Sequence, residues 1–150
     1  MRAVIQRVTN ASVCVDNTII SKIGNGLLVL LGVEINDTKD DALWLASKIA
    51  NLRIFSDDNE NMNNSILDID GEVIVVSQFT LYAKTKKGNR PSYINAARPE
   101  QALLLYEQFK MDLSKFICKE VYSGKFGSHM KVNLLNDGPV TIVIDTKNKE

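Results

Sequence analysis

The stretch EVIVVSQFTL, residues 72–81, is predicted to be a strand that begins apolar and ends polar. Residues 73–76 are all valine or isoleucine, a run that is typical of a strand buried on both faces. Patterns typical of helices lie on both sides of this stretch in the sequence. Together they favour an α/β fold in which helices cover part of a mixed sheet.

Each flanking helix is indicated by apolar residues at helical spacing. The first follows Asp37 or Thr38, either of which can cap it, and acidic residues stand in its first turn. Pro99 suits the first position of the second helix. The two apolar stripes consist of Ala42, Leu45, Ala46 and Ile49, and of Ala102, Leu105, Tyr106, Phe109 and Leu113.

Short runs separated by turn signals predict antiparallel hairpins elsewhere in the chain. The polar, asparagine-rich residues 56–65 are predicted to form a loop, and we assign no role to the part at 57–64. The charged residues 147–150 are expected to fray. The remaining strands are predicted at residues 2–9, 12–16, 18–23, 27–33, 129–135 and 140–146.

The composition indicates one globular domain, residues 1–150. No apolar run approaches the ~20 residues of a membrane span. The 18 basic and 18 acidic residues cancel, which argues against a broadly basic nucleic-acid coat but leaves room for a local patch. The N-terminus has no signal-peptide pattern, so we expect a soluble, cytoplasmic protein without a membrane partner.

The cysteine and histidine content limits the possible chemistry. Cys14 and Cys118 are far apart and form no CxxC motif, so we expect reduced structural thiols. His129 is the one histidine, and neither a metal site nor a Ser-His-Asp triad is predicted. His129 by itself is expected to be structural or exposed rather than catalytic.

Three polar side chains, Ser77, Gln78 and Thr80, come together where the strand at 72–81 ends. A rigid strand end is a common position for a functional site. The Gln78 amide is a donor, nearby backbone N–H groups can stabilise an oxyanion, and the Thr80 hydroxyl is a nucleophile or a donor. No base stands beside Thr80 in the sequence. The alternative is a strand that leaves the core with its hydroxyls bonded to the backbone.

Residues 83–93, AKTKKGNRPSY, form a glycine-containing loop that has basic residues and no acidic one. Such a loop can hold phosphates, and Tyr82 and Tyr93 on its flanks can stack on bases. Its place directly after the polar strand end favours one site that holds a charged tail and acts on the end of that tail. A solvated basic loop is the alternative. The candidate contacts are Lys84, Lys86, Lys87 and Arg90.

Gly138-Pro139 stands at the start of an apolar run. Asp137-Gly138 alone would predict a hairpin turn, but Pro139 has a fixed φ and no N–H for a ladder. Glycine permits close approach of the backbone, and a bond that precedes proline can be cis. The sequence therefore predicts a rigid corner here.

Motifs in four places resemble the D-aminoacyl-tRNA deacylases, as do the opening MRAVIQRVTNASV and the segment GLLVLLGV. The likeness runs from residue 1 to about residue 146. The pair SQFT and NDGPVT, in this order and spacing, is highly specific. The four motifs are SQFTL at 77–81, KGNRPS at 87–92, GKFGSHMKV at 124–132 and NDGPVT at 136–141.

The resemblance implies a hydrolase that cleaves the ester between a D-amino acid and the 3′-terminal adenosine of tRNA, and that also removes glycine mischarged on tRNA for alanine. It implies a cytoplasmic homodimer with two active sites at the subunit interface and no metal or other cofactor. The implied fold has three layers, two β-layers of mixed or antiparallel strands with two main helices on one side. The outline of elements above agrees with this fold.

The resemblance also assigns roles to single residues. Gly138-Pro139 matches a Gly-cis-Pro motif that enters the partner's pocket and excludes L side chains. Ser77 belongs to the other wall of that pocket. Gln78 and the backbone N–H groups of Phe79 and Thr80 would hold the substrate carbonyl, while the 2′-OH of the terminal ribose assists the reaction.

Two residues depart from the family pattern. Tyr93 stands where the family often has phenylalanine, and His129 stands where small or acidic residues are common. These departures concern contacts to tRNA rather than the reaction. Two alternatives stay open: a non-catalytic RNA- or DNA-binding module that uses the basic loop 84–90, and a general esterase with Thr80 as its nucleophile.

Overall fold

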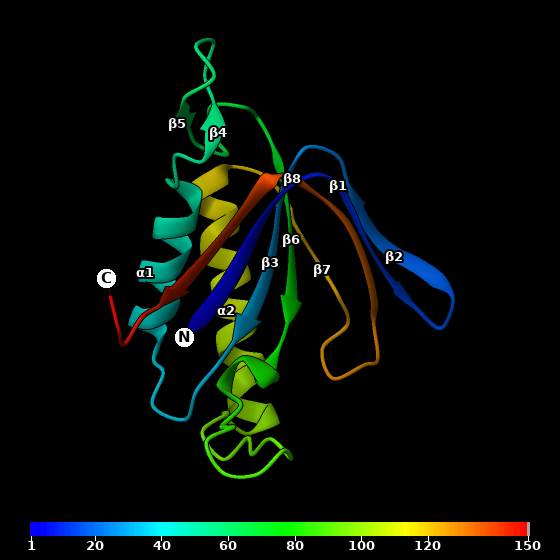
Figure 1. The fold of residues 1–150 in the computed structure, drawn as a ribbon, viewed down its shortest axis with the longest axis vertical. Helices are drawn as coiled ribbons and strands as arrows, with labels where there is room; N and C mark the ends of the chain where they lie inside the picture. The colour runs from blue at the N-terminus through cyan, green and yellow to red at the C-terminus, as the bar shows by residue number, and fades with distance from the viewer. Residues whose placement is uncertain (150) are drawn as a thin grey trace.

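Two α-helices pack against one face of a twisted sheet in the computed structural model, which describes residues 1–149 (Figure 1). No helix among these residues is long and apolar enough to cross a membrane. In chain order the elements are β1 (Arg2–Val15), β2 (Thr18–Ile23), β3 (Gly26–Gly32), α1 (Lys39–Ala50), β4 (Phe55–Ser56), β5 (Met62–Asn64), β6 (Glu72–Ser77), the 3₁₀ helix η1 (Phe79–Tyr82), α2 (Pro99–Ile117), β7 (Val121–Ser123) and β8 (Lys131–Asp145).

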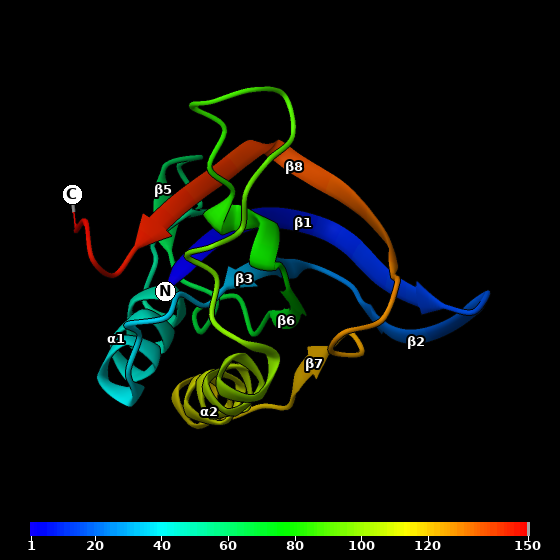
Figure 2. The ribbon, with the colours of Figure 1, turned by 90° about the horizontal axis from the view of Figure 1, so that it is seen from below.

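Six strands form one mixed sheet in the order β2-β1-β3-β6-β7, and β8 pairs with β1 along nearly its whole length. The strands β3, β6 and β7 run parallel, whereas β1 is antiparallel to β2, β3 and β8. Figure 2 shows α1 and α2 together beneath the sheet, while β1, β2 and β8 extend beyond the helices. The predicted mixed α/β class, with two helices on one side, is confirmed.

The central strands β3 and β6 are buried on both faces. Leu27 and Val73 pack in the core between the sheet and the helices. Leu28 and Ile74 pack in a second cluster on the opposite face of the sheet. Side chains of β1 and β2 join that second cluster, so these curled strands cover the back of β3 and β6. The run at 73–76 is therefore apolar because layers cover both of its faces, as predicted.

Both predicted helices are present, and their apolar stripes face the core. α1 follows Thr38, whose N–H and hydroxyl donate to the Asp41 carboxylate at 2.9 and 3.0 Å. Pro99 is the first residue of α2, where a missing N–H leaves no bond unmade. α2 ends before Cys118, which adopts a left-handed conformation with φ 53°.

Two pairs of predicted strands are single strands. β1 covers 2–9 and most of 12–16, and β8 covers most of both 129–135 and 140–146. The prediction of separate strands was wrong because turn signals between the apolar runs were read as strand ends, although each strand continues through them. Residues 137–140 bulge out of the β1–β8 ladder, and pairing resumes on both sides of them.

The predicted strand at 72–81 ends at Ser77, and residues 79–82 form η1 instead. The Gln78 N–H still donates to Leu31 of β3 at 2.8 Å, after which the chain leaves the sheet. The polar end of this stretch therefore lies at a strand terminus, as expected, but earlier than expected.

The polar residues 56–65 contain the short β4–β5 hairpin rather than loop alone. Asp57 closes its turn by accepting hydrogen bonds from the N–H groups of Asn59 and Asn61, at 2.9 and 3.0 Å. The Asn63 side chain donates to the same carboxylate at 2.6 Å. Such side-chain bonds stabilise a turn without apolar residues, which is why composition predicted only a loop.

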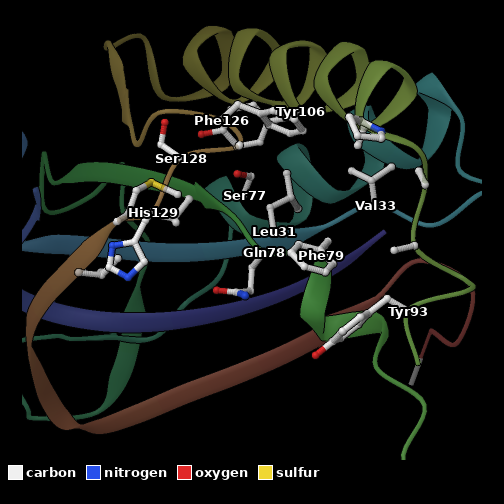
Figure 3. Close-up of a pocket in the computed structure, with 18 residues that line it drawn as sticks. Leu31, Val33, Ser77, Gln78, Phe79, Tyr93, Tyr106, Phe126, Ser128 and His129 are labelled. Carbon is white, nitrogen blue, oxygen red and sulfur yellow. The ribbon is translucent and has the colours of Figure 1, made fainter. Parts of the chain in front are cut away.

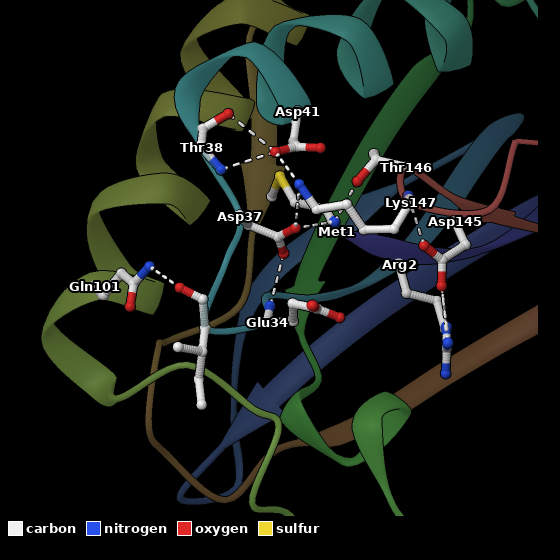
Figure 4. Close-up of polar contacts among 11 residues, drawn as sticks. Met1, Arg2, Glu34, Asp37, Thr38, Asp41, Gln101, Asp145, Thr146 and Lys147 are labelled. Atoms are coloured by element: carbon white, nitrogen blue, oxygen red, sulfur yellow. Dashed lines mark hydrogen bonds and ion pairs between the residues drawn. The ribbon is translucent and has the colours of Figure 1, made fainter.

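Both ends of the described chain meet at the start of α1 (Figure 4). The Met1 amine pairs with Asp37 at 2.5 Å, and both groups are fully buried. Within the tail at 147–150 that was expected to fray, Lys147 reaches Asp41 at 2.8 Å, while residue 150 lies outside the described residues. The residues that follow β8 are thus joined to the first turn of α1.

Candidate active site

A pocket of about 580 Å³ opens between the end of β6, the start of α2 and the connection from β7 to β8 (Figure 3). Its lining is mainly apolar and aromatic with a few polar groups, as in sites for small organic groups. The lining residues are Leu31, Val33, Val76, Ser77, Gln78, Phe79, Tyr93, Ala96, Ala97, Pro99, Ala102, Tyr106, Phe126, Gly127, Ser128, His129, Met130 and Val132.

Three of the predicted site residues lie in one wall of this pocket. Ser77 and Gln78 reach it because β6 ends there, and the bond from Gln78 to Leu31 holds the exit from the sheet. Phe79 opens η1 directly afterwards, and its side chain also lines the pocket. The strand end therefore presents polar and aromatic groups at a fixed position.

Thr80 lies one residue further along and does not line the pocket. Its hydroxyl accepts a hydrogen bond from the side-chain amide of Gln78. The N–H groups of Phe79 and Thr80 stand in the first turn of η1. The first backbone N–H groups of a helix have no partner within the helix. Thr80 is thus placed to orient the Gln78 amide.

The opposite wall is aromatic, and the sequence did not predict it as part of a site. The rings of Tyr106 on α2 and Phe126 after β7 have centroids 5.7 Å apart. The Tyr106 hydroxyl donates to the carbonyl of Val75 at 2.8 Å. Burial raises the pKa of Tyr106 well above its usual range, so this phenol stays a neutral donor. The motif at 124–132 was the only sequence signal that pointed toward Phe126.

His129 lies on the β7–β8 connection and lines the pocket with an exposed side chain. Figure 3 places His129 and Tyr93 at different ends of the pocket. Tyr93 instead contacts Phe79, with ring centroids 5.0 Å apart.

The basic loop 84–90 lies outside the pocket, next to Tyr93. Lys84 and Ser92 exchange two backbone hydrogen bonds of 2.8 and 3.0 Å that close the loop. Tyr82, which was predicted to flank the loop as a stacking ring, is only 5% exposed and therefore belongs to the interior. The candidate tRNA contacts Lys84, Lys86, Lys87 and Arg90 are all exposed.

The Gly138-Pro139 corner does not line the pocket of its own chain. It belongs to the bulge of β8, both residues are exposed, and their peptide bond is cis. Arg7, which no sequence pattern singled out, donates to the carbonyls of Asp137 at 3.0 Å and Ile54 at 2.6 Å. A Cβ at Gly138, where φ is 130°, would lie 2.9 Å from the Arg7 side chain. The corner is thus held from behind by a buried arginine.

Comparisons with known proteins cover nearly the whole chain. The family model described as D-Tyr-tRNA(Tyr) deacylase matches residues 4–145. Proteins named D-aminoacyl-tRNA deacylase from Flavobacterium psychrophilum and Bacteroides fragilis are each 60% identical, with 100% of this chain and 100% of each relative covered.

Solved structures share the fold of this chain. A c-Myc DNA Unwinding Element Binding Protein has a TM-score of 0.90 and 42% identity, covering 97% of this chain and 98% of its own. A probable eukaryotic D-amino acid tRNA deacylase has a TM-score of 0.82 at 16% identity, covering 95% and 97%, and supports the fold alone. Family model, relatives and fold lead to one conclusion: the chain belongs to the D-aminoacyl-tRNA deacylase family of ester hydrolases.

Proposed function

We propose that this protein hydrolyses the ester between a D-amino acid and the 3′-terminal adenosine of tRNA, and likewise removes glycine mischarged on tRNA for alanine. The observation that carries the proposal is the pocket wall of Ser77, Gln78 and Phe79, in a chain that matches the family model over residues 4–145. Charged tRNA is used in the cytoplasm, so we infer that the protein works there.

The pocket suits a nucleoside with an ester at its edge. Phe126 supplies aromatic surface for a base and is backed by the buried ring of Tyr106, while Ser77 supplies a hydroxyl for the polar edge of the base. The Gln78 amide and the N–H groups that open η1 would then face the ester carbonyl. Donors aimed at that oxygen stabilise the negative charge that develops on it during hydrolysis.

An aminoacyl ester is already activated, so the protein has little covalent chemistry to perform. Holding the ester and stabilising its oxyanion together lower a barrier substantially. The 2′-OH of the terminal ribose lies next to the ester in the substrate itself and would assist water. Thr80 would orient Gln78 rather than attack, which agrees with its position outside the pocket lining.

Chiral selection in this proposal needs a second copy of the chain. Gly138-Pro139 is exposed and outside its own pocket, at a bulge that Arg7 holds. A homodimer would place the corner of one subunit in the pocket of the other. There it would admit a hydrogen but reject an L side chain. Apolar side chains on the same strand that such a contact would cover are Leu134, Leu135 and Val143, which are 38%, 57% and 63% exposed.

The experiment that tests this function compares D-tyrosyl-tRNA with L-tyrosyl-tRNA. The D ester is expected to be hydrolysed, while the L ester decays only at its spontaneous rate. Equal acceleration of both esters, or of neither, would contradict the proposal. Glycyl-tRNA for alanine is assayed beside them, because its hydrolysis tests the glycine activity separately.

A second candidate function is non-catalytic binding of RNA or DNA through the basic loop 84–90. The observation that favours it is the exposed basic loop, together with 42% identity to a protein named for binding a DNA unwinding element. Measuring nucleic-acid binding and ester hydrolysis on the same protein preparation distinguishes the two candidates. A binding module would retain nucleic-acid affinity without hydrolysing any aminoacyl-tRNA, whereas the enzyme hydrolyses the D ester.

A further inference from the structure

Two aromatic rings stand exposed at the mouth of the pocket. Phe79 is 56% exposed and Tyr93 is 37% exposed, and both line the pocket. Their centroids lie 5.0 Å apart with an interplanar angle of 71°. In such an edge-to-face pair, the ring that presents its edge keeps both faces clear of its partner. Figure 3 shows Phe79 and Tyr93 next to each other, on the side of the pocket away from His129.

Positive charge is concentrated next to these rings. Residues 83–98 contain five basic side chains and no acidic one. None of the five forms an ion pair with any residue of 1–149, although Arg2, Arg7 and Lys147 do. The backbone bonds between Lys84 and Ser92 hold the loop directly before Tyr93. Basic side chains that form no ion pair among residues 1–149 therefore lie in the segment next to the aromatic pair.

Pocket, rings and cations form a continuous path, and we propose that Phe79 and Tyr93 are a stacking platform for the nucleobase that precedes the terminal adenosine. This inference rests on the proposed function, because it assumes that the terminal adenosine occupies the pocket. The backbone phosphates upstream then run along loop 84–90. Aromatic platforms beside a basic groove are the usual means of holding single-stranded nucleic acid.

The charge pattern favours a nucleic acid over a second copy of the chain as the occupant of this platform. The formal net charge of the chain is zero, so another copy offers no net attraction to the loop. A single strand of nucleic acid brings one phosphate charge with every base, which suits alternating contacts to rings and cations.

The test uses two small substrates, D-tyrosyl-adenosine and a D-tyrosyl trinucleotide ending in CCA. The measured quantity is the ratio of kcat/KM for the trinucleotide to kcat/KM for the nucleoside. In Tyr93→Ser this ratio is expected to fall about 5- to 150-fold, the range that stacking of one base supplies. Tyr93→Phe keeps the ring and is expected to keep the ratio. Ile94→Ser is the matched control, because Ile94 is 70% exposed and does not line the pocket.

A trinucleotide that lacks the base before the terminal adenosine completes the experiment. With the wild-type protein, this substrate is expected to lose the higher kcat/KM that the intact trinucleotide has over the nucleoside. With Tyr93→Ser, its kcat/KM is expected to fall no further. An unchanged ratio in Tyr93→Ser, with both substrates hydrolysed, would overturn the platform. The platform would also be overturned if the ratio were unchanged and light scattering gave Tyr93→Ser a different molecular mass in solution from wild type. That result would assign the rings to a subunit contact.

Failure of the platform and failure of the proposed function remain distinguishable. Uncharged CCA and its abasic counterpart are compared by fluorescence polarisation, which needs no hydrolysis. If no ester is cleaved but Tyr93→Ser abolishes the preference for the intact base, the platform stands and the proposed function fails. If esters are cleaved but the preference is absent from the wild-type protein, the platform fails alone.

Discussion

Thr80 carries the hydroxyl that a nucleophilic mechanism would use, but its surroundings give it a supporting role. Its oxygen accepts the hydrogen bond of the Gln78 amide and does not line the pocket. A nucleophilic hydroxyl needs a base within hydrogen-bond reach. No base is bonded to Thr80 among residues 1–149, and the one histidine lies on the β7–β8 connection. We therefore propose that Thr80 orients a donor.

The substitution Thr80→Ala tests this role. Losing one orienting hydrogen bond is expected to lower kcat for D-tyrosyl-tRNA about 2- to 12-fold, because a single such bond contributes roughly 0.5–1.5 kcal/mol. Thr80→Ser, which keeps the hydroxyl, should stay close to the wild-type rate. Removal of a true nucleophile costs several powers of ten. Single-turnover hydrolysis distinguishes these outcomes, and complete loss in Thr80→Ala would make Thr80 the nucleophile.

At the scale of elements, the first turn of α1 is one place where pH acts on stability. Burial raises the pKa of Asp41, but hydrogen bonds from Lys147, Thr146 and Thr38 outweigh it and hold that pKa well below its usual range. The folded protein therefore binds this proton less tightly than the unfolded chain does. The carboxylate contributes its full stability above the unfolded pKa of about 4, and the contribution is lost as the pH falls below it.

Asp41→Asn is expected to lower the free energy of unfolding by about 1 kcal/mol at pH 7, because it removes the charge that pairs with Lys147. The difference from wild type should shrink steadily below about pH 4. Urea unfolding at pH 7 and pH 3 measures it. Asp40→Asn is the control, since Asp40 is an exposed acid in the same turn. A difference independent of pH would contradict this assignment.

The sequence predicted those elements whose pattern is complete within a few residues. The run at 73–76 and the helical stripes are local patterns. Spacing alone therefore predicted that the strand is buried on both faces and that the two helices form. The continuity of β8 was missed, because its bulge is supported by Arg7, 130 residues away in the chain. Local pattern carries no information about such a partner.

The candidate site divides in the same way. Ser77 and Gln78 stand at a strand end, so composition and position indicated them, whereas Phe79 was indicated only by the resemblance to a family. Tyr106 and Phe126 become a wall only when α2 and the segment after β7 pack against each other, and their apolar character fits an ordinary core equally well. Only the resemblance to a family drew attention to the segment that contains Phe126.

At the scale of the whole molecule, the two halves of the proposed site lie apart in one chain. Gln78 lines the pocket, whereas the Gly138-Pro139 corner is exposed on the bulge of β8 and does not. A dimer that joins the pocket of one subunit to the corner of the other makes every site composite. Two defective subunits can then complement each other if their defects lie in different halves.

Mixed dimers of Gln78→Ala and Gly138→Ala subunits test this arrangement. Each homodimer is expected to hydrolyse D-tyrosyl-tRNA poorly, the first for want of a donor and the second because its new Cβ would lie 2.8 Å from Val140. Thermal unfolding is used to check that each variant is folded. Random reassociation should restore about a quarter of the wild-type sites, because half of the dimers are mixed and each holds one intact site. Mixing Gln78→Ala with Phe79→Pro, which lacks the backbone N–H proposed as a donor, should restore none, since both defects lie in the pocket. If pocket and corner of the same chain formed the site, the first mixture would remain as inactive as the second.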